Sequence, residues 1–143
     1  MAQLINVKGL RELQGRIDEF KIEVKEEAED MVRRIAFAVD STVVRMSPVD
    51  TGRFRANWQV TMSAPATGTI DHVPGKGGSS TGANTRKALD QLQMVMKDYE
   101  LGKPVFIVNN VVYGPRLNDG HSKQAPRNFL KIAVEAGIAQ AKS

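Results

Sequence analysis

The sequence predicts an α+β fold, in which a long N-terminal helix and a C-terminal helix pack on a small, mostly antiparallel sheet. Three observations support this prediction: an apolar repeat at helical spacing over about residues 10–46, two short strand-like segments, and a further helical pattern near the C-terminal end. The 143 residues are 41% hydrophobic and 25% charged, so we expect a single domain, 1–143, with a modest core.

The long N-terminal helix is predicted from apolar residues that recur in steps of three or four between Leu10 and Val43. Pro48 ends it, because the residue before a proline is disfavoured in helical geometry. A helix of about 36 residues would be about 54 Å long, so part of it should project from a domain of this size. A break near residues 26–30 is an alternative. The apolar stripe either faces the core or also packs on a neighbouring subunit.

A corner and a strand should follow this helix. Pro48, Asp50 and Gly52 occur in an order typical of a turn, since proline presets φ, aspartate bonds the local backbone and glycine permits positive φ. Residues 56–62 then alternate between apolar and polar, as in a half-buried strand. Three residues are expected on one face of it: Trp58, Val60 and Met62.

The second half of the chain predicts a loop, two helices and a strand. Residues 63–84 are rich in Ser, Thr, Gly and Pro, so we expect a flexible loop that becomes ordered on assembly. Asn84 should cap a helix over about 85–100, which Gly102 ends. The apolar run 105–109 indicates a strand buried on both faces. Pro126 suits the first turn of a last helix. The inward residues of the two helices are predicted to be Leu89, Leu92, Val95 and Met96, then Phe129, Leu130, Ile132, Ala133, Val134 and Ile138.

Several classes of function are excluded or disfavoured by composition. Without cysteine there is no disulfide, zinc–thiolate site or thiol nucleophile. The two histidines, His72 and His121, lack acidic neighbours at ligand spacing, so no metal or other cofactor is expected. We expect neither a signal peptide nor a membrane-spanning segment.

Two short motifs could indicate an enzyme, and neither is convincing. Asp50-Thr51-Gly52 matches the aspartic-protease triplet, but it follows a helix end, and the charges of Arg53 and Arg55 would oppose a proton shared by two carboxylates. The glycine-rich run 75–82 lacks the Gly-Lys-Ser/Thr order of a phosphate loop. We therefore expect no catalytic residue.

Charge is unevenly distributed along the chain. Residues 1–50 hold 8 Lys/Arg against 10 Asp/Glu, and residues 51–143 hold 12 against 6. Opposite charges on separate surfaces fit head-to-tail subunit contacts, and a basic DNA-binding accessory protein is the alternative. The acidic candidates for such a contact are Glu23, Glu26 and Glu27, in a cluster with Glu29 and Asp30. The basic candidates are Arg53, Arg55, Arg116, Lys123, Arg127 and Lys131.

Two sequence blocks resemble a family of bacteriophage proteins. The first block covers residues 46–58 and contains Pro48, Asp50, Thr51, Gly52, Arg53 and Trp58. The second covers residues 107–126 and contains Asn110, Tyr113, Gly120, His121 and Ser122. In this order and spacing they resemble the tail-completion, or minor tail protein Z-like, family of tailed phages, over about residues 10–135. The family usually has an acidic and then an aromatic residue before Gly-His-Ser, where this chain has Asn118-Asp119.

The resemblance implies a structural virion protein of the phage neck, assembled in the host cytoplasm. It would form a ring, expected to be a hexamer, that finishes the tail and allows head–tail joining. The implied partners are further copies of the chain, the tail terminator, the tail tube and the head–tail connector. DNA would pass through the lumen, so any contact with it should be unspecific. No membrane partner is implied.

Overall fold

The structure, a computed structural model, describes residues 7–49 and 52–143 of the chain. Its elements in chain order are α1 (Val7–Met46), α2 (Arg53–Ala56), β1 (Trp58–Met62), α3 (Thr81–Met96), β2 (Val105–Asn109), α4 (Gly114–Asn118) and α5 (Phe129–Lys142). Strands β1 and β2 pair antiparallel, with Trp58 opposite Asn109 and Met62 opposite Val105. The predicted α+β class is confirmed, with its long N-terminal helix, C-terminal helix and small antiparallel sheet.

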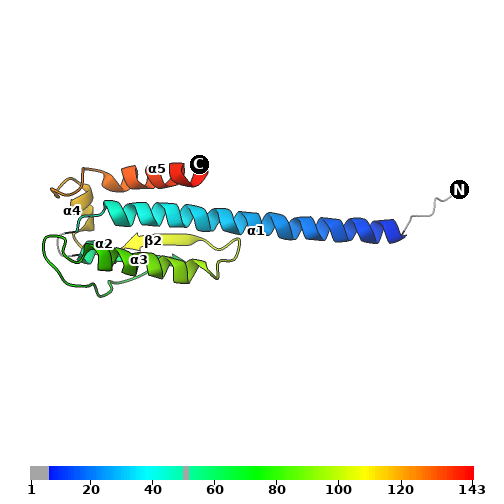
Figure 1. Cartoon of the computed structure of the whole chain (residues 1–143), viewed down its shortest axis with the longest axis horizontal. Coiled ribbons are helices and arrows are strands. Elements are labelled where there is room, and N and C mark those ends of the chain that lie inside the picture. The colour runs from blue at the N-terminus through cyan, green and yellow to red at the C-terminus, as the bar shows by residue number, and fades with distance from the viewer. Residues whose placement is uncertain (1–6, 50–51) are drawn as a thin grey trace.

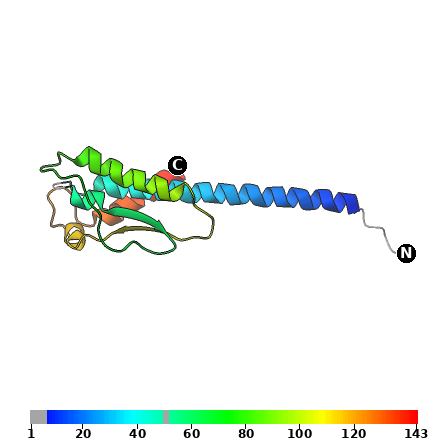
Figure 2. The ribbon, with the colours of Figure 1, turned by 90° about the horizontal axis from the view of Figure 1, so that it is seen from below.

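Helix α1 is unbroken over 40 residues, which corresponds to about 60 Å at about 1.5 Å per residue. No proline interrupts it, and it ends at Met46, just before Pro48. The break suggested near residues 26–30 does not occur. The N-terminal half of α1 extends away from the other elements, whereas its C-terminal half lies at the centre of the fold (Figures 1 and 2). The expected projection is therefore present.

Helix α5 lies along the C-terminal half of α1, and the sheet and α3 lie on the other side of α1 (Figure 1). The face of α5 that is buried carries small residues at every fourth position, Ala133, Gly137 and Ala141. A Cβ atom built on Gly137 would lie 2.7 Å from the Cα atom of Val39. The backbones of α1 and α5 are thus in direct contact at this glycine.

The inward face predicted for α5 is correct only in part. Phe129 and Ala133 are buried, whereas Ile132 and Ile138 remain 44% and 37% exposed. These isoleucines lie beside the stripe of small residues, and two helices in such close contact bury only a narrow strip of each other. The helix also begins later than predicted, at Phe129, and Asn128 before it has a φ of 60°, in the left-handed region that asparagine tolerates better than most residues.

The core is built around three aromatic rings. The ring of Phe54 meets those of Trp58 and Phe129 edge to face, with centroid distances of 5.8 and 6.1 Å. Trp58 is 6% exposed, and Val60 is fully buried in a second cluster against which Met62 packs. The face predicted for these three residues of β1 is therefore confirmed.

Two other predicted elements differ from the structure. Strand β2 is half-buried along its whole length instead of buried on both faces, because it is an edge strand of a two-stranded sheet. Helix α3 begins at Thr81 after Ser80 and ends at Met96, so it is shifted towards the N-terminus relative to the prediction. Asn84 lies inside its first turn instead of capping it, and Gly102 is too far beyond its end to stop it.

Candidate assembly surfaces

A row of exposed apolar side chains runs along the projecting half of α1. Its members recur every three or four residues and therefore share one helix face. This row, called here the α1 stripe, consists of Leu10, Leu13, Ile17, Phe20 and Val24. Ile17 is 40% exposed and Phe20 65%. Further along the same repeat, Met31 and Ile35 are still 49% and 38% exposed, whereas the body partly buries Val39 and buries Val43. An exposed apolar row on a helix that has left its domain is typical of a surface that binds another protein.

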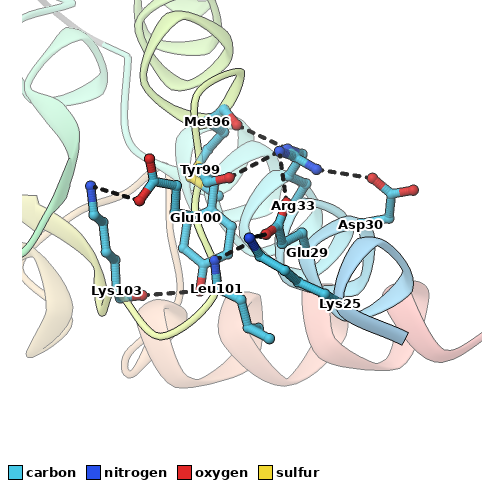
Figure 3. A network of polar contacts seen from close by, with 9 residues as sticks. All are labelled: Lys25, Glu29, Asp30, Arg33, Met96, Tyr99, Glu100, Leu101 and Lys103. Carbon is cyan, nitrogen blue, oxygen red and sulfur yellow. Dashed lines mark hydrogen bonds and ion pairs between the residues drawn. The ribbon is translucent and has the colours of Figure 1, made fainter. Parts of the chain in front are cut away.

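A polar network fixes α1 where it leaves the body (Figure 3). The Arg33 guanidinium donates to the carbonyl oxygens of Met96 and Tyr99 at 3.0 and 3.1 Å. Glu29 accepts from the backbone N–H of Leu101 at 3.3 Å and lies 3.8 Å from Arg33. These bonds join one face of α1 to the α3–β2 connection, so the direction of the projecting half is set by the body. Glu29, part of the acidic cluster, is thereby engaged inside the subunit.

The corner after α1 depends on Gly52. Its φ is 81°, which confirms the positive φ predicted for this turn. A Cβ atom there would collide with the side-chain amide of Asn84 and lie 2.8 Å from the Ser80 Oγ. Gly52 thus permits both the turn and the close approach of the start of α3. Asp50 and Thr51 of the same motif lie outside the described residues.

Arg55, one of the predicted contact residues, is 8% exposed and has a structural role within the subunit. Its guanidinium donates to the carbonyl oxygens of Arg45 and Ser47 at 2.6 and 2.7 Å, and to the Thr85 hydroxyl at 3.1 Å. Burial, and secondly the charge of Arg45, lower the pKa of Arg55. The side chain satisfies carbonyls at the end of α1 and joins them to α3. Its predicted part in a subunit contact stays a prediction.

Buried amide side chains hold the long loop between β1 and α3. Asn57 pairs with both backbone groups of Ile70, accepting at 2.7 Å and donating at 3.2 Å. Asn84 pairs likewise with Val73, at 2.8 and 2.9 Å. Each amide thus provides both hydrogen-bond partners of one backbone residue in the loop. Sequence reasoning missed this role, because Asn57 fitted the strand alternation and Asn84 fitted a helix cap. The flexibility of residues 63–80 stays a prediction, and residues 81–84 belong to α3.

The second sequence block contributes packing and loop contacts. Asn110 donates to the carbonyl oxygens of Ala66 and Gly68 at 2.8 and 3.0 Å, so its side chain holds the long loop against the end of β2. A Cβ on Gly114 would lie 3.1 Å from Phe54, which explains the glycine by close packing.

The loop before α5 contains Gly120, His121 and Ser122 of the second block. The Ser122 hydroxyl accepts from the Gln124 N–H at 3.1 Å, a local bond within this loop. Gly120 has a φ of 94°, and the side chain of His121 is exposed.

Parts of the two blocks meet at one open depression of about 410 Å³. Pro48, Gly52 and Arg53 line it from the first block and Tyr113 from the second, together with His72. The Arg53 guanidinium lies 5.9 Å from the centroid of the Tyr113 ring, a distance that allows a cation–π contact. The structure therefore brings together residues that are about 60 positions apart in sequence.

The other predicted contact residues are on the surface. The side chains of Glu23, Glu26 and Glu27 on α1 are exposed. Exposed basic side chains are found at Arg53, Arg116, Lys123, Arg127 and Lys131. Their role in a subunit contact stays a prediction.

A family model described as "Bacteriophage HK97-gp10, putative tail-component" matches residues 11–99. The match covers more than half of the chain, runs from α1 to just beyond α3, and includes the whole first block. The chain belongs to the HK97-gp10-like family. No curated protein and no solved structure matches it.

Membership of the HK97-gp10-like family makes this protein a bacteriophage tail component and hence part of the virion. The resemblance to a phage tail family is confirmed at this level; the match includes the first block, and the second block lies beyond the matched residues. A tail component is a structural protein, which favours a non-enzymatic role, and the DNA-binding alternative receives no support from the match. Within residues 7–49 and 52–143, no helix is long and apolar enough to cross a bilayer.

Proposed function

We propose that this tail component is a ring-forming tail-completion, or neck, subunit, which finishes the head-proximal end of the tail and makes it competent to join the head. The observation that carries the proposal is the α1 stripe on a helix of about 60 Å that is half outside its domain. Covering each of these partly exposed side chains contributes on the order of 1 kcal/mol. A subunit that offers such a helix needs a partner to cover it.

The position of the α1 stripe supports a ring. The projecting half of α1 lies beyond the body of its own subunit (Figure 1). A contact between this arm and a different surface of the next copy is head-to-tail, and repetition of such a contact closes a ring when the rotation permits. By the resemblance, we expect a hexamer.

The remaining partners are proposed from the place of such a ring in the virion. The tail tube and tail terminator would lie on one side of it and the head–tail connector on the other. DNA passing through the lumen would meet basic side chains without sequence readout, through its phosphates alone.

The experiment compares self-association and tail joining in matched variants. Ile17→Asp combined with Phe20→Asp places charge in the α1 stripe; we expect a monomer by native mass spectrometry and, in phage complementation, tails that fail to join heads. Met94→Asp is the control, because Met94 is 70% exposed on α3, outside the stripe. Normal rings and normal joining by the double variant would contradict the proposal.

A further inference from the structure

A groove with an apolar floor runs between α1 and α3 on the body. Two adjoining depressions form it, of about 550 and 220 Å³, and they share Phe37 of α1 and Gln93 of α3. Phe37 is 43% exposed although it lies beside the core, and the half-buried Leu89 adds apolar surface from α3. The feature is called here the α1–α3 groove.

The ends of the α1–α3 groove are basic. Arg45 and Arg86 line one end and Lys97 the other, and none of the ion pairs in the described part of the chain includes these three residues. Asp90 also lines the groove, so cations outnumber carboxylates there. Arg55 also lines the larger depression, and its Nε atom is buried without a hydrogen-bond partner in the described residues. The groove therefore favours an occupant that is apolar along its centre and carries acidic side chains near an end.

The projecting part of α1 has this character. The α1 stripe supplies the apolar centre, and Glu23 and Glu27 border it on one side, four residues apart. The other side carries Lys21 and Lys25. From Leu10 to Val24 the stripe is about 21 Å long, and the groove along α3 from Gly82 to Lys97 is about 22 Å. Because α1 is one unbroken helix, the stripe of a subunit cannot reach the groove of the same subunit.

We infer that the α1 stripe of one subunit docks in the α1–α3 groove of the next copy, with Phe20 against Phe37 and Leu89 and the acidic edge near Arg45 and Arg86. This inference rests on the proposed ring and names its contact. One contact covers both unpartnered apolar surfaces, and because it joins two different surfaces it can repeat around a ring. In this inferred contact the basic partners of the acidic edge are Arg45 and Arg86, and not Arg55.

Engineered cysteines test the contact directly, since the chain has none of its own. We expect the full chain with Phe20→Cys and Leu89→Cys to form a ladder of disulfide-linked oligomers on mild oxidation, on the order of tenfold more than either single variant. The ladder should disappear on reduction. Phe20→Cys with Val112→Cys is the control, because Val112 is 91% exposed and lies outside the groove. Circular dichroism verifies that each variant is folded.

A charge exchange provides an independent readout. Arg45→Glu with Arg86→Glu, or Glu23→Lys with Glu27→Lys, should each weaken self-association on the order of tenfold, and mixing the two double variants should restore it.

The outcomes separate the inference from the proposed ring. If the wild type forms rings and joins tails but the variant with Phe20→Cys and Leu89→Cys gives no ladder, the inference is wrong and the ring stands. Equal cross-linking by Phe20→Cys alone indicates helix-to-helix pairing and also overturns it. If the Arg45/Arg86 variant forms normal rings but loses binding to duplex DNA, the groove is a phosphate site and the inference is wrong. A wild type that stays monomeric and joins no tails overturns both.

Discussion

Asp40 is a buried carboxyl group in the middle of the core, and its removal should change stability in a pH-dependent way. It is fully buried on α1, one turn from Ala36 and one from Val44, which belong to the two core clusters. Neither carboxyl oxygen has a hydrogen-bond partner in the described residues. Burial raises the pKa of Asp40 from 3.8 to about 7.

The size of the pH-dependent change in stability follows from the difference between the pKa of Asp40 in the folded and in the unfolded chain. The folded protein holds the proton more tightly than the unfolded chain, so between pH 3.8 and about 7 the folded state binds more protons. The contribution of Asp40 to stability is therefore fully present below pH 3.8 and is lost as the pH rises to about 7. Each pKa unit of difference corresponds to about 1.4 kcal/mol. Above neutral pH, the free energy of unfolding is therefore lower by about 4 kcal/mol. A domain of this size is stable by only about 5–15 kcal/mol, so the effect should be measurable.

Asp40→Asn tests this reasoning, because the amide has the shape of the carboxyl group but does not ionise. We expect the variant to exceed the wild type in free energy of unfolding by about 2–4 kcal/mol at pH 8, and by much less at pH 4. Urea unfolding, followed by Trp58 fluorescence across this range, measures the difference. Asp98→Asn is the control, because Asp98 is exposed and should show no such trend. A difference that is constant with pH, or an Asp40→Asn variant less stable than wild type at pH 8, would refute the argument.

Four further predictions concern packing and the long loop. Trp58→Ala should lower the free energy of unfolding by about 3–5 kcal/mol in chemical denaturation, since the ring is buried; a loss below about 1 kcal/mol would contradict this. Gly137→Ala should cost about 1–3 kcal/mol, because its Cβ would meet the α1 backbone. Gly15→Ala, in open space on the same α1, should instead stabilise by up to about 1 kcal/mol, and equal effects of the two changes would disprove the close contact. Gly52→Ala should lower the melting temperature through both its positive φ and the collision with Asn84; an unchanged melting curve would argue against that corner. Limited trypsin digestion should cut first after Lys76, because this exposed residue follows the loop residues that are bonded to Asn57 and Asn84. A first cut at another site would contradict this prediction.

Much of the fold could be predicted because it depends on local patterns. The spacing of apolar residues identified α1 and its end at Pro48, and the alternation around Trp58 identified the buried face of β1. The limits of α3 and α5 were displaced, because Asn84 and Pro126 are compatible with more than one position near a helix start.

The candidate site was less predictable, because the same side chain serves in a contact or in the interior depending on what surrounds it. Arg55 looked like a surface cation, yet carbonyls at the end of α1 bind it inside the subunit. The acidic cluster looked uniform, yet Glu29 is engaged by the α3–β2 connection while Glu23 and Glu27 remain exposed. The groove formed by Phe37, Leu89 and their neighbours comes from two helices far apart in sequence, so no local motif indicated it.

The sequence by itself determined the long helix, the buried face of β1, the positive φ at Gly52 and the likeness to a phage tail family. Each of these depends on short segments of residues that are close to one another along the chain. Only the tertiary structure decided which part of the apolar repeat is covered. The repeat is continuous from Leu10 to Val43, but α5 and the sheet reach only the C-terminal half of α1, and Gly137 sets how closely α5 lies. Whether a residue is buried depends on where distant segments of the chain lie in space. A periodic pattern shows which face of a helix is apolar, but it does not show which segment covers that face.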